Sequence, residues 1–227
     1  MTEAEWLSSN YTEKLLNFLN GKVSNRKLRL FSVGCCKYIQ HLMPEPQCQD
    51  AVSTAERFAD GLVDDCSLSL AADVANRIAA ANNTNSHGRY WAARAAAYSA
   101  TLNAHEAAVG AVSTYYMAVL SAGPSPQEDM PARNAISDNA YRLFKILRFD
   151  IFGNPFRFVS FNPKWRTSGI FLQAQRMYDS RDFCTMPILS DALQDAGCEN
   201  EDIMNHCRSE GPHVRGCWVV DLILGKE

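Results

Sequence analysis

The stretch SNRKLRLFSVGCCKYIQHL, residues 24–42, indicates the fold class more clearly than any other part of the chain. Its apolar side chains recur at steps of three and four residues: Leu28, Phe31, Cys35, Tyr38, Ile39 and Leu42. Such spacing places one apolar stripe along an α-helix. Ser24 is a suitable residue to cap the start of this helix, and Pro44 is suited to end it. The stretch therefore predicts an amphipathic helix.

The same period of about 3.6 residues continues through most of the chain. Thr2 and Glu5 have the spacing of a capping box, and Asn200 is placed to cap a short helix that ends near Cys207. The alanine-rich residues 87–122 predict one long helix or two stacked helices, because alanine favours helix and lets helices approach closely. We find no strand-hairpin pattern and no repeat. We therefore expect an all-α fold, a multi-helix globular bundle with a compact helical C-terminal motif.

The strongest break in the chain is the Gly-Pro-Ser-Pro segment at 123–126. It suggests an N-terminal helical region, residues 1–123, that contains the alanine-rich helices. Residues 124–227 would then form a C-terminal helical region with an aromatic-rich connector and a closing helix. We expect that closing helix over 213–224, anchored by Trp218 and stopped by Gly225. A single domain is the alternative.

Composition and charge narrow the class of protein. Hydrophobic residues make up 47 % of the 227 residues and charged residues 21 %, which is typical of a globular chain. The net charge of −3 gives no global attraction to nucleic acid or membranes. The N-terminus carries acids where a secretory signal has Lys or Arg, and the uncharged run 107–127 is too polar for a membrane span. Eight cysteines without a CxxC pair suggest reduced thiols. We expect a cytoplasmic protein that does not contact a membrane.

The two ends of the chain resemble a known family. The N-terminal words are MTEAEWL at 1–7 and LLNFLNGKVSNRKLRLFSVGCCKYIQHL at 15–42. The C-terminal words are NPFRFVSFNPKW at 154–165 and DALQDAGCENEDIMNHCRSEGPHVRGCWVVDLILGKE at 191–227. Both ends are similar to those of a large family of uncharacterised proteins that is abundant in planctomycete bacteria. The resemblance leaves residues 50–150 unmatched, and it implies no activity, cofactor or catalytic residue.

A group of cysteines and histidines near the C-terminus contains our candidate metal ligands: Cys198, His206, Cys207, His213 and Cys217. Thiolate and imidazole are the ligands that zinc prefers. On a helix, His213 and Cys217 would project from one face because they are four residues apart. Against zinc, His206 and Cys207 are adjacent and would point about 100° apart on a helix. Cys217 also lies in an apolar run, as a core thiol does. We therefore expect no cofactor and no stoichiometric zinc, with zinc as the alternative.

The pair His213 and Cys217 also has the spacing of a base and a nucleophile on a helix. Arg215 is the only cation close to it in this helix, and the sequence shows no oxyanion-hole motif or orienting acid. A packed terminal helix explains the same residues. The sequence therefore identifies no catalytic residue, and it leaves open whether the protein is an enzyme.

Charge is unevenly distributed along the chain. Residues 22–37 carry five cations and no acid, whereas 45–73 carry seven acids and one arginine. Residues 141–166 mix six cations with seven phenylalanine or tryptophan side chains, and Asp150 is the one acid among them. Basic and aromatic side chains together can bind single-stranded nucleic acid. The simpler interpretation is that the aromatic rings are core anchors, and that the basic and acidic faces meet within the fold or across a homodimer.

Three classes of function follow from these observations. We favour a scaffold or protein–protein interaction module that recognises another protein, or a second copy of itself, through grooves between helices. A metal-binding or thiol-dependent enzyme centred on the C-terminal Cys/His group is the first alternative. A nucleic-acid binder that uses residues 141–166 is the second.

Overall fold

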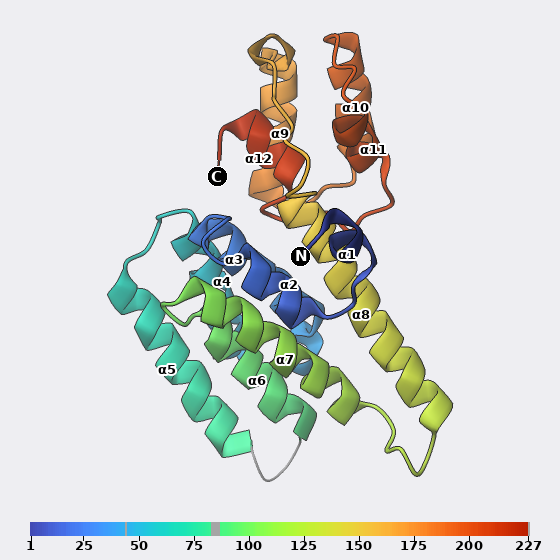
Figure 1. The fold of residues 1–227 in the computed structure, drawn as a ribbon. Helices are drawn as coiled ribbons and strands as arrows, with labels where there is room; N and C mark the ends of the chain where they lie inside the picture. Colours follow the sequence, from blue (N-terminus) through green and yellow to red (C-terminus); the bar gives the residue numbers. More distant parts are fainter. Residues whose placement is uncertain (44, 83–86, 227) are drawn as a thin grey trace. The chain divides into compact units, whose positions relative to one another are not determined.

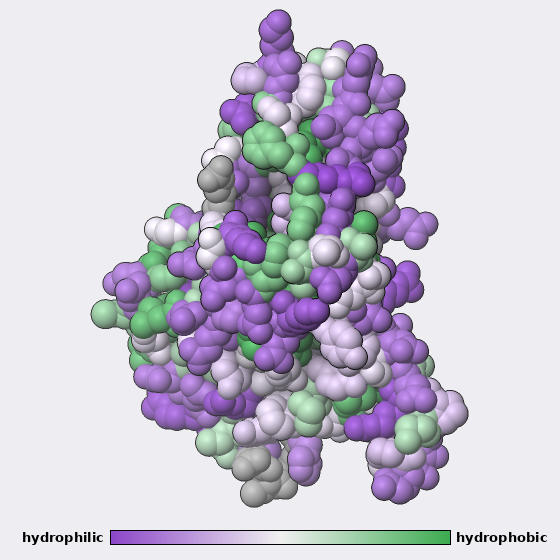
Figure 2. All heavy atoms as spheres, in the orientation of Figure 1, coloured by the Kyte–Doolittle hydropathy of each residue, from purple (hydrophilic) through white to green (hydrophobic). Residues whose placement is uncertain are grey.

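The protein is described here from a computed structural model that covers residues 1–43, 45–82 and 87–226. Within these ranges the chain forms twelve α-helices, two 3-10 turns and no β-strand (Figure 1). The predicted all-α fold is confirmed. In the described residues no helix combines the length and the apolar character that crossing a membrane requires. Figure 2 shows that hydrophilic side chains cover most of the visible face, with hydrophobic ones in smaller groups.

The chain divides into two compact units, Met1–Lys145 and Ile146–Glu227. The division falls inside a helix, α8, and so lies further along the chain than the Gly-Pro-Ser-Pro break at 123–126, which separates α7 from α8. The N-terminal unit contains α1 (Glu3–Ser8), α2 (Thr12–Leu19), α3 (Asn25–Tyr38), η1 (Gln40–Leu42), α4 (Pro46–Ala59), α5 (Asp65–Asn82), α6 (His87–Ser99), α7 (Ala104–Ala122) and the first part of α8 (Met130–Phe152).

Local sequence sets the ends of several helices as predicted. Thr2 and Glu5 form a complete capping box at the start of α1. The Ser24 hydroxyl accepts a hydrogen bond from the Lys27 backbone N–H, 3.3 Å away, and so caps α3. The predicted stop at Pro44 lies outside the described residues, but α3 already ends at Tyr38. Each cap satisfies a backbone donor that the first helical turn leaves unpaired.

The alanine-rich stretch forms two packed helices, α6 and α7, and α7 also packs against α3. The alanines of the two helices are largely buried. At Gly110 the approach is so close that an added Cβ would lie only 2.2 Å from the Tyr98 ring. Small side chains therefore let α6 and α7 come together along their length.

The basic and acidic stretches of the N-terminal unit meet within the fold. The Arg26 Nε atom lies 3.2 Å from a carboxylate oxygen of Asp60. Lys37 pairs with Glu56, whose side chain is buried. For these two pairs the interpretation that basic and acidic faces meet inside the protein is confirmed.

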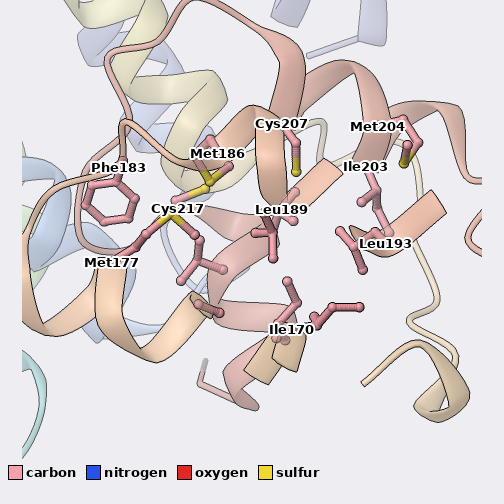
Figure 3. Packing of buried hydrophobic residues seen from close by; sticks show 14 of the residues in the cluster. Ile170, Met177, Phe183, Met186, Leu189, Leu193, Ile203, Met204, Cys207 and Cys217 are labelled. Atoms are coloured by element: carbon pink, nitrogen blue, oxygen red, sulfur yellow. The ribbon is translucent and has the colours of Figure 1, made fainter. Parts of the chain in front are cut away.

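The C-terminal unit contains the end of α8, followed by η2 (Pro163–Trp165), α9 (Ser168–Ser180), α10 (Met186–Asp195), α11 (Glu201–Arg208) and α12 (Trp218–Leu224). Here α9 packs against α10 and α12, and α10 packs against α11. Their buried faces form one core (Figure 3), which includes Met177, Met186, Leu189, Cys207 and Cys217.

The predicted closing helix over 213–224 is too long. The helix α12 begins only at Trp218, and residues 210–217 form irregular backbone with a turn at 215–216. Gly216 has a φ angle of 95°, which interrupts a right-handed helix at that point. The predicted stop is confirmed, because Gly225 adopts the left-handed conformation (φ 69°) directly after the helix. Trp218 is partly buried and packs against the core of the C-terminal unit.

Candidate metal centre

Four side chains from three parts of the C-terminal unit converge on one point. Asp150 belongs to the last turn of α8, and His206 lies near the end of α11. His213 lies in the segment between α11 and α12, and Cys217 is the residue before α12. One ligand atom from each of the four residues lies within 4.8 Å of the others. They are an aspartate oxygen, two imidazole nitrogens and a thiol sulfur.

Local structure places the two histidines near the aspartate. The Asn200 side chain accepts a hydrogen bond from the Ile203 backbone N–H, 3.0 Å away, and so caps α11 as predicted. After α11, positive φ angles at Gly211 (66°) and Gly216 (95°) turn the chain before α12 begins. Such φ angles are easily adopted by glycine alone. The backbone between these turns carries His213 back to Asp150.

Both histidines contact the same atom of the aspartate, Oδ1 of Asp150. His213 Nδ1 lies 2.6 Å from it, and His206 Nε2 lies 3.2 Å from it. His206 Nε2 is also 3.1 Å from the Cys217 sulfur. The other carboxylate oxygen, Oδ2, accepts a hydrogen bond from the Val214 backbone N–H at 2.8 Å. Oδ1 therefore faces the histidines, while Oδ2 is held by the backbone.

The cluster is nearly closed to solvent. Asp150 is 3 % exposed and Cys217 is 0 % exposed. Burial alone would raise the pKa of Asp150, but hydrogen bonds and charge from His206 and His213 together outweigh it, so this pKa lies below its usual value. Burial, with a contribution from Asp150, holds the pKa of the Cys217 thiol well above its usual value. Without a further positive charge the site thus favours a carboxylate beside a neutral thiol.

The three closest of these separations are shorter than those of tetrahedral metal coordination. With metal–ligand bonds of 2.0–2.3 Å, the donor atoms of a zinc site lie about 3.3–3.8 Å apart. The contacts of His206 Nε2 with Asp150 and Cys217, at 3.2 and 3.1 Å, need to lengthen by only a few tenths of an ångström. The His213–Asp150 contact of 2.6 Å must open further, by about 0.7–1.2 Å against the same zinc spacing.

The same geometry argues against a catalytic relay of Cys217, His206 and Asp150. In a relay, the base uses one ring nitrogen for the nucleophile and the other for the orienting acid. Here a single atom, His206 Nε2, faces both the sulfur and the carboxylate. A reactive thiol also needs partial exposure and a lowered pKa, whereas Cys217 is fully buried and its pKa is raised. Atoms that point at one centre are typical of metal ligands.

The sequence-based candidates divide into two groups. His206, His213 and Cys217 belong to the cluster. Cys198 and Cys207 share the hydrophobic core with Cys217 but do not belong to the cluster, and burial raises the pKa of both thiols. Figure 3 shows Cys207 and Cys217 in this packed region, carried by different segments. The helical i,i+4 arrangement expected for His213 and Cys217 is wrong, because neither residue is in α12.

Sequence reasoning missed Asp150, although the sequence contains one signal of its role. It is the one acid in the basic stretch 141–166, and it falls in the last turn of a helix. A carboxylate is unfavourable there, because the carbonyl end of a helix carries partial negative charge. An acid in such a position indicates a partner elsewhere in the fold.

The aromatic and basic residues of the C-terminal connector are partly engaged within their own unit. Phe161 and Trp165 pack edge to face, with ring centroids 5.5 Å apart, and Arg166 donates a hydrogen bond to the Leu222 carbonyl. Arg157 lies 3.3 Å from Asp202. Phe158, by contrast, is 96 % exposed. Some of the positive charge on which nucleic-acid binding would depend, that of Arg157 and Arg166, is therefore already engaged within the protein.

Comparison of the chain with protein-family models, with curated proteins and with solved structures found no match. The resemblance of the two chain ends to the planctomycete family therefore stays a prediction.

Proposed function

We propose that the C-terminal unit binds one transition-metal ion, of which zinc fits best, through Asp150, His206, His213 and Cys217. The convergence of their four ligand atoms within 4.8 Å carries this proposal. The adjacency of His206 and Cys207 counted against zinc only if both residues had to be ligands. In the structure His206 turns to the cluster and Cys207 to the core, so that objection does not apply.

The donor set indicates the class of metal. A thiolate and two imidazoles suit zinc and its neighbours in the first transition row, whereas magnesium and calcium require mainly oxygen ligands. A divalent ion would also change the protonation of the site. Beside it, Cys217 would ligate as the thiolate, although burial alone keeps this thiol neutral.

The role we infer for the ion is structural. Four protein ligands complete a tetrahedron and leave no position for a substrate, which is typical of structural zinc sites. The ion would tie the end of α8 to α11 and to the residue that precedes α12. Metal that binds only the folded state stabilises it by about 2.7 kcal/mol at a hundredfold excess over the dissociation constant.

For the C-terminal unit we therefore favour metal binding over a scaffold role and over nucleic-acid binding. The scaffold or interaction role remains our proposal for the N-terminal unit, and its basis is a groove described below. We also propose a cytoplasmic location, which is supported by eight cysteines that are all free thiols.

Cobalt(II) provides the sharpest test, because a cobalt–thiolate bond gives strong near-ultraviolet absorption that an N,O site lacks. Protein stripped with chelator should bind one equivalent of cobalt or zinc, show this band with cobalt, and melt at a higher temperature. Cys217→Ala should lose the band. Cys198→Ala and Cys207→Ala are matched controls, because each removes a buried thiol outside the cluster and should keep the band.

Two results would contradict the proposal. One is the absence of metal binding by the stripped protein at micromolar cobalt or zinc. The other is a band that survives in Cys217→Ala but disappears in Cys207→Ala, since the sulfur ligand would then be a different residue.

A further inference from the structure

Two neighbouring hollows lie on the N-terminal unit, on either side of a row of polar residues. Glu13 and Asn17 of α2 and Ser113 of α7 line both hollows, so the two are continuous across this row. Their volumes are about 560 and 670 Å³. All three residues of the row are exposed. We refer to the two hollows together as the α2–α7 groove.

Aromatic rings line each half of the groove. Tyr11, Tyr116, Tyr141 and Phe144 line the half toward α8, and Tyr90, Trp91 and Tyr98 line the half toward α6. The rings form packed groups. The ring centroids of Tyr116 and Tyr141 are 5.6 Å apart, and those of Tyr90 and Trp91 are 4.8 Å apart. Tyr11 is 79 % exposed at the rim. Each half therefore offers ring faces or edges, and phenol or indole groups that can donate hydrogen bonds.

The groove also contains two carboxylates that have no ion-pair partner in the part of the chain that is described, those of Glu13 and Glu106. Of the two cationic side chains in its walls, Lys14 is paired with an acid outside the groove, whereas Arg94 is hydrogen-bonded to neutral groups and keeps its charge. Lys14 lies 3.5 Å from Glu5, and the Arg94 guanidinium donates to Asn76 at 2.5 Å and to the Tyr98 hydroxyl at 3.2 Å. Two carboxylates against one guanidinium leave a net negative charge in the groove, which favours a cationic group in the partner.

Protein grooves bind peptides in a few recurring ways, and most of them do not suit this one. Strand addition needs a sheet edge, and the described residues contain no strand. An amphipathic helix needs a continuous apolar floor, but the exposed polar row of Glu13, Asn17 and Ser113 crosses the middle. A phosphorylated peptide would be repelled by the free carboxylates.

We propose that the α2–α7 groove binds a proline-rich peptide in the polyproline II conformation, with a basic residue that pairs with Glu13 or Glu106. Such a peptide makes no internal hydrogen bonds, so its carbonyls can accept from Tyr, Trp and Asn side chains. Its proline rings pack on aromatic side chains, and the two hollows provide places for them on either side of the polar row. The partner is thus another protein with an exposed proline-rich segment.

Binding can be measured on the full-length protein by fluorescence polarisation. The probe is a labelled ten-residue peptide that alternates proline with leucine and ends in arginine, and the comparison peptide has alanine in place of every proline. We expect the proline peptide to bind at least tenfold more tightly. Tyr11→Ala should weaken its binding about tenfold, which corresponds to about 1.4 kcal/mol. Glu13→Gln should weaken it about threefold and reduce its dependence on salt.

Tyr11 is so exposed that its truncation should leave the fold intact, and circular dichroism checks this. Phe158→Ala is the matched control, because it removes an exposed aromatic ring from the other unit and should leave binding unchanged. The proposal is overturned if the proline peptide does not bind at millimolar concentration, if the alanine peptide binds equally well, or if neither groove variant weakens binding. Saturable binding of oligosaccharides without peptide binding would assign the groove to a different class of ligand.

Discussion

Arg29 is a buried cation that caps the C-terminal end of a neighbouring helix. It lies in α3 with 2 % of its surface exposed. Its guanidinium donates hydrogen bonds of 2.8 Å to the carbonyls of Ser99, Thr101 and Leu102, which lie at and just beyond the end of α6. These carbonyls have no helical partners, so the arginine satisfies acceptors that the end of a helix leaves open. Burial lowers the pKa of Arg29 to about 10, and the group therefore remains charged at neutral pH.

Replacing Arg29 with methionine should destabilise the protein by about 3 kcal/mol, because buried carbonyls would lose their donors. Urea unfolding followed by circular dichroism measures this change. Arg89→Met is the control, since Arg89 is exposed on α6 and its replacement should change stability by less than about 0.5 kcal/mol. Equal unfolding midpoints for the two variants would show that the three carbonyls do not depend on Arg29.

The sequence could not separate Arg29 from its neighbours. It belongs to a stretch of five cations that together resemble a basic surface. Only the fold shows that Arg29 points inward, because its three acceptors lie about seventy residues further along the chain. Asp150 presents the same difficulty, since its partners His206 and His213 are 56 and 63 residues away.

The packing of α6 on α7 depends on a glycine. An added Cβ at Gly110 would meet three atoms of the Tyr98 ring at 2.2–2.7 Å. The ring cannot move freely, because the Arg94 guanidinium lies over it and donates to its hydroxyl. The usual gain in helix propensity on replacing glycine with alanine, about 1 kcal/mol, is therefore outweighed at this position.

Gly110→Ala should lower the melting temperature, whereas Gly169→Ala should leave it unchanged or raise it slightly. Gly169 is a matched control, because it is also helical, in α9, and nothing lies within 4 Å of a Cβ added there. Differential scanning calorimetry of both variants provides the measurement. If the Gly110→Ala variant melted at a higher temperature than the wild type, α6 and α7 would be able to move apart at this position without a loss of stability.

Most helices could be predicted, because hydrophobic period and capping residues act over only a few positions. Thr2, Ser24 and Asn200 all cap as expected. The helix predicted over 213–224 failed because its apolar run hid the interruption at Gly216. That failure matters for the candidate metal centre, since the turn at Gly216, and not a helical face, places Cys217 beside His206.

The protein as a whole holds protonated thiols in both of its units. Burial raises the pKa of Cys36 and of Cys207 from an ordinary value of 9.0 to about 12. Below pH 9 both thiols are neutral in the folded and the unfolded chain, so their contribution to stability is fully present. Between pH 9 and about 12 the unfolded chain loses these protons while the folded protein keeps them. Stability therefore falls as the pH rises through this window.

We expect the free energy of unfolding to decrease from pH 8 to pH 10.5 more steeply in the wild type than in Cys36→Ala or Cys207→Ala. Each thiol contributes up to about 1.4 kcal/mol per pH unit within the window. Urea unfolding across this range gives the slope for each protein. Cys66→Ala is the control, because Cys66 is exposed and its removal should leave the slope unchanged. Identical slopes in all four proteins would refute this account of the thiols.

The hydrogen bond from the Val214 backbone N–H to Oδ2 of Asp150 has a consequence for competition among metals. Cells contain far more free magnesium than free zinc, so a site must reject the abundant ion by its composition. Magnesium needs six oxygen ligands and calcium six to eight, often with bidentate carboxylates. The hydrogen bond that Oδ2 already accepts disfavours bidentate coordination by this carboxylate, and the remaining ligand atoms of the cluster are nitrogen and sulfur. In our proposal, this composition and the backbone contact make the site a poor competitor for the common ions and leave it to the scarce one.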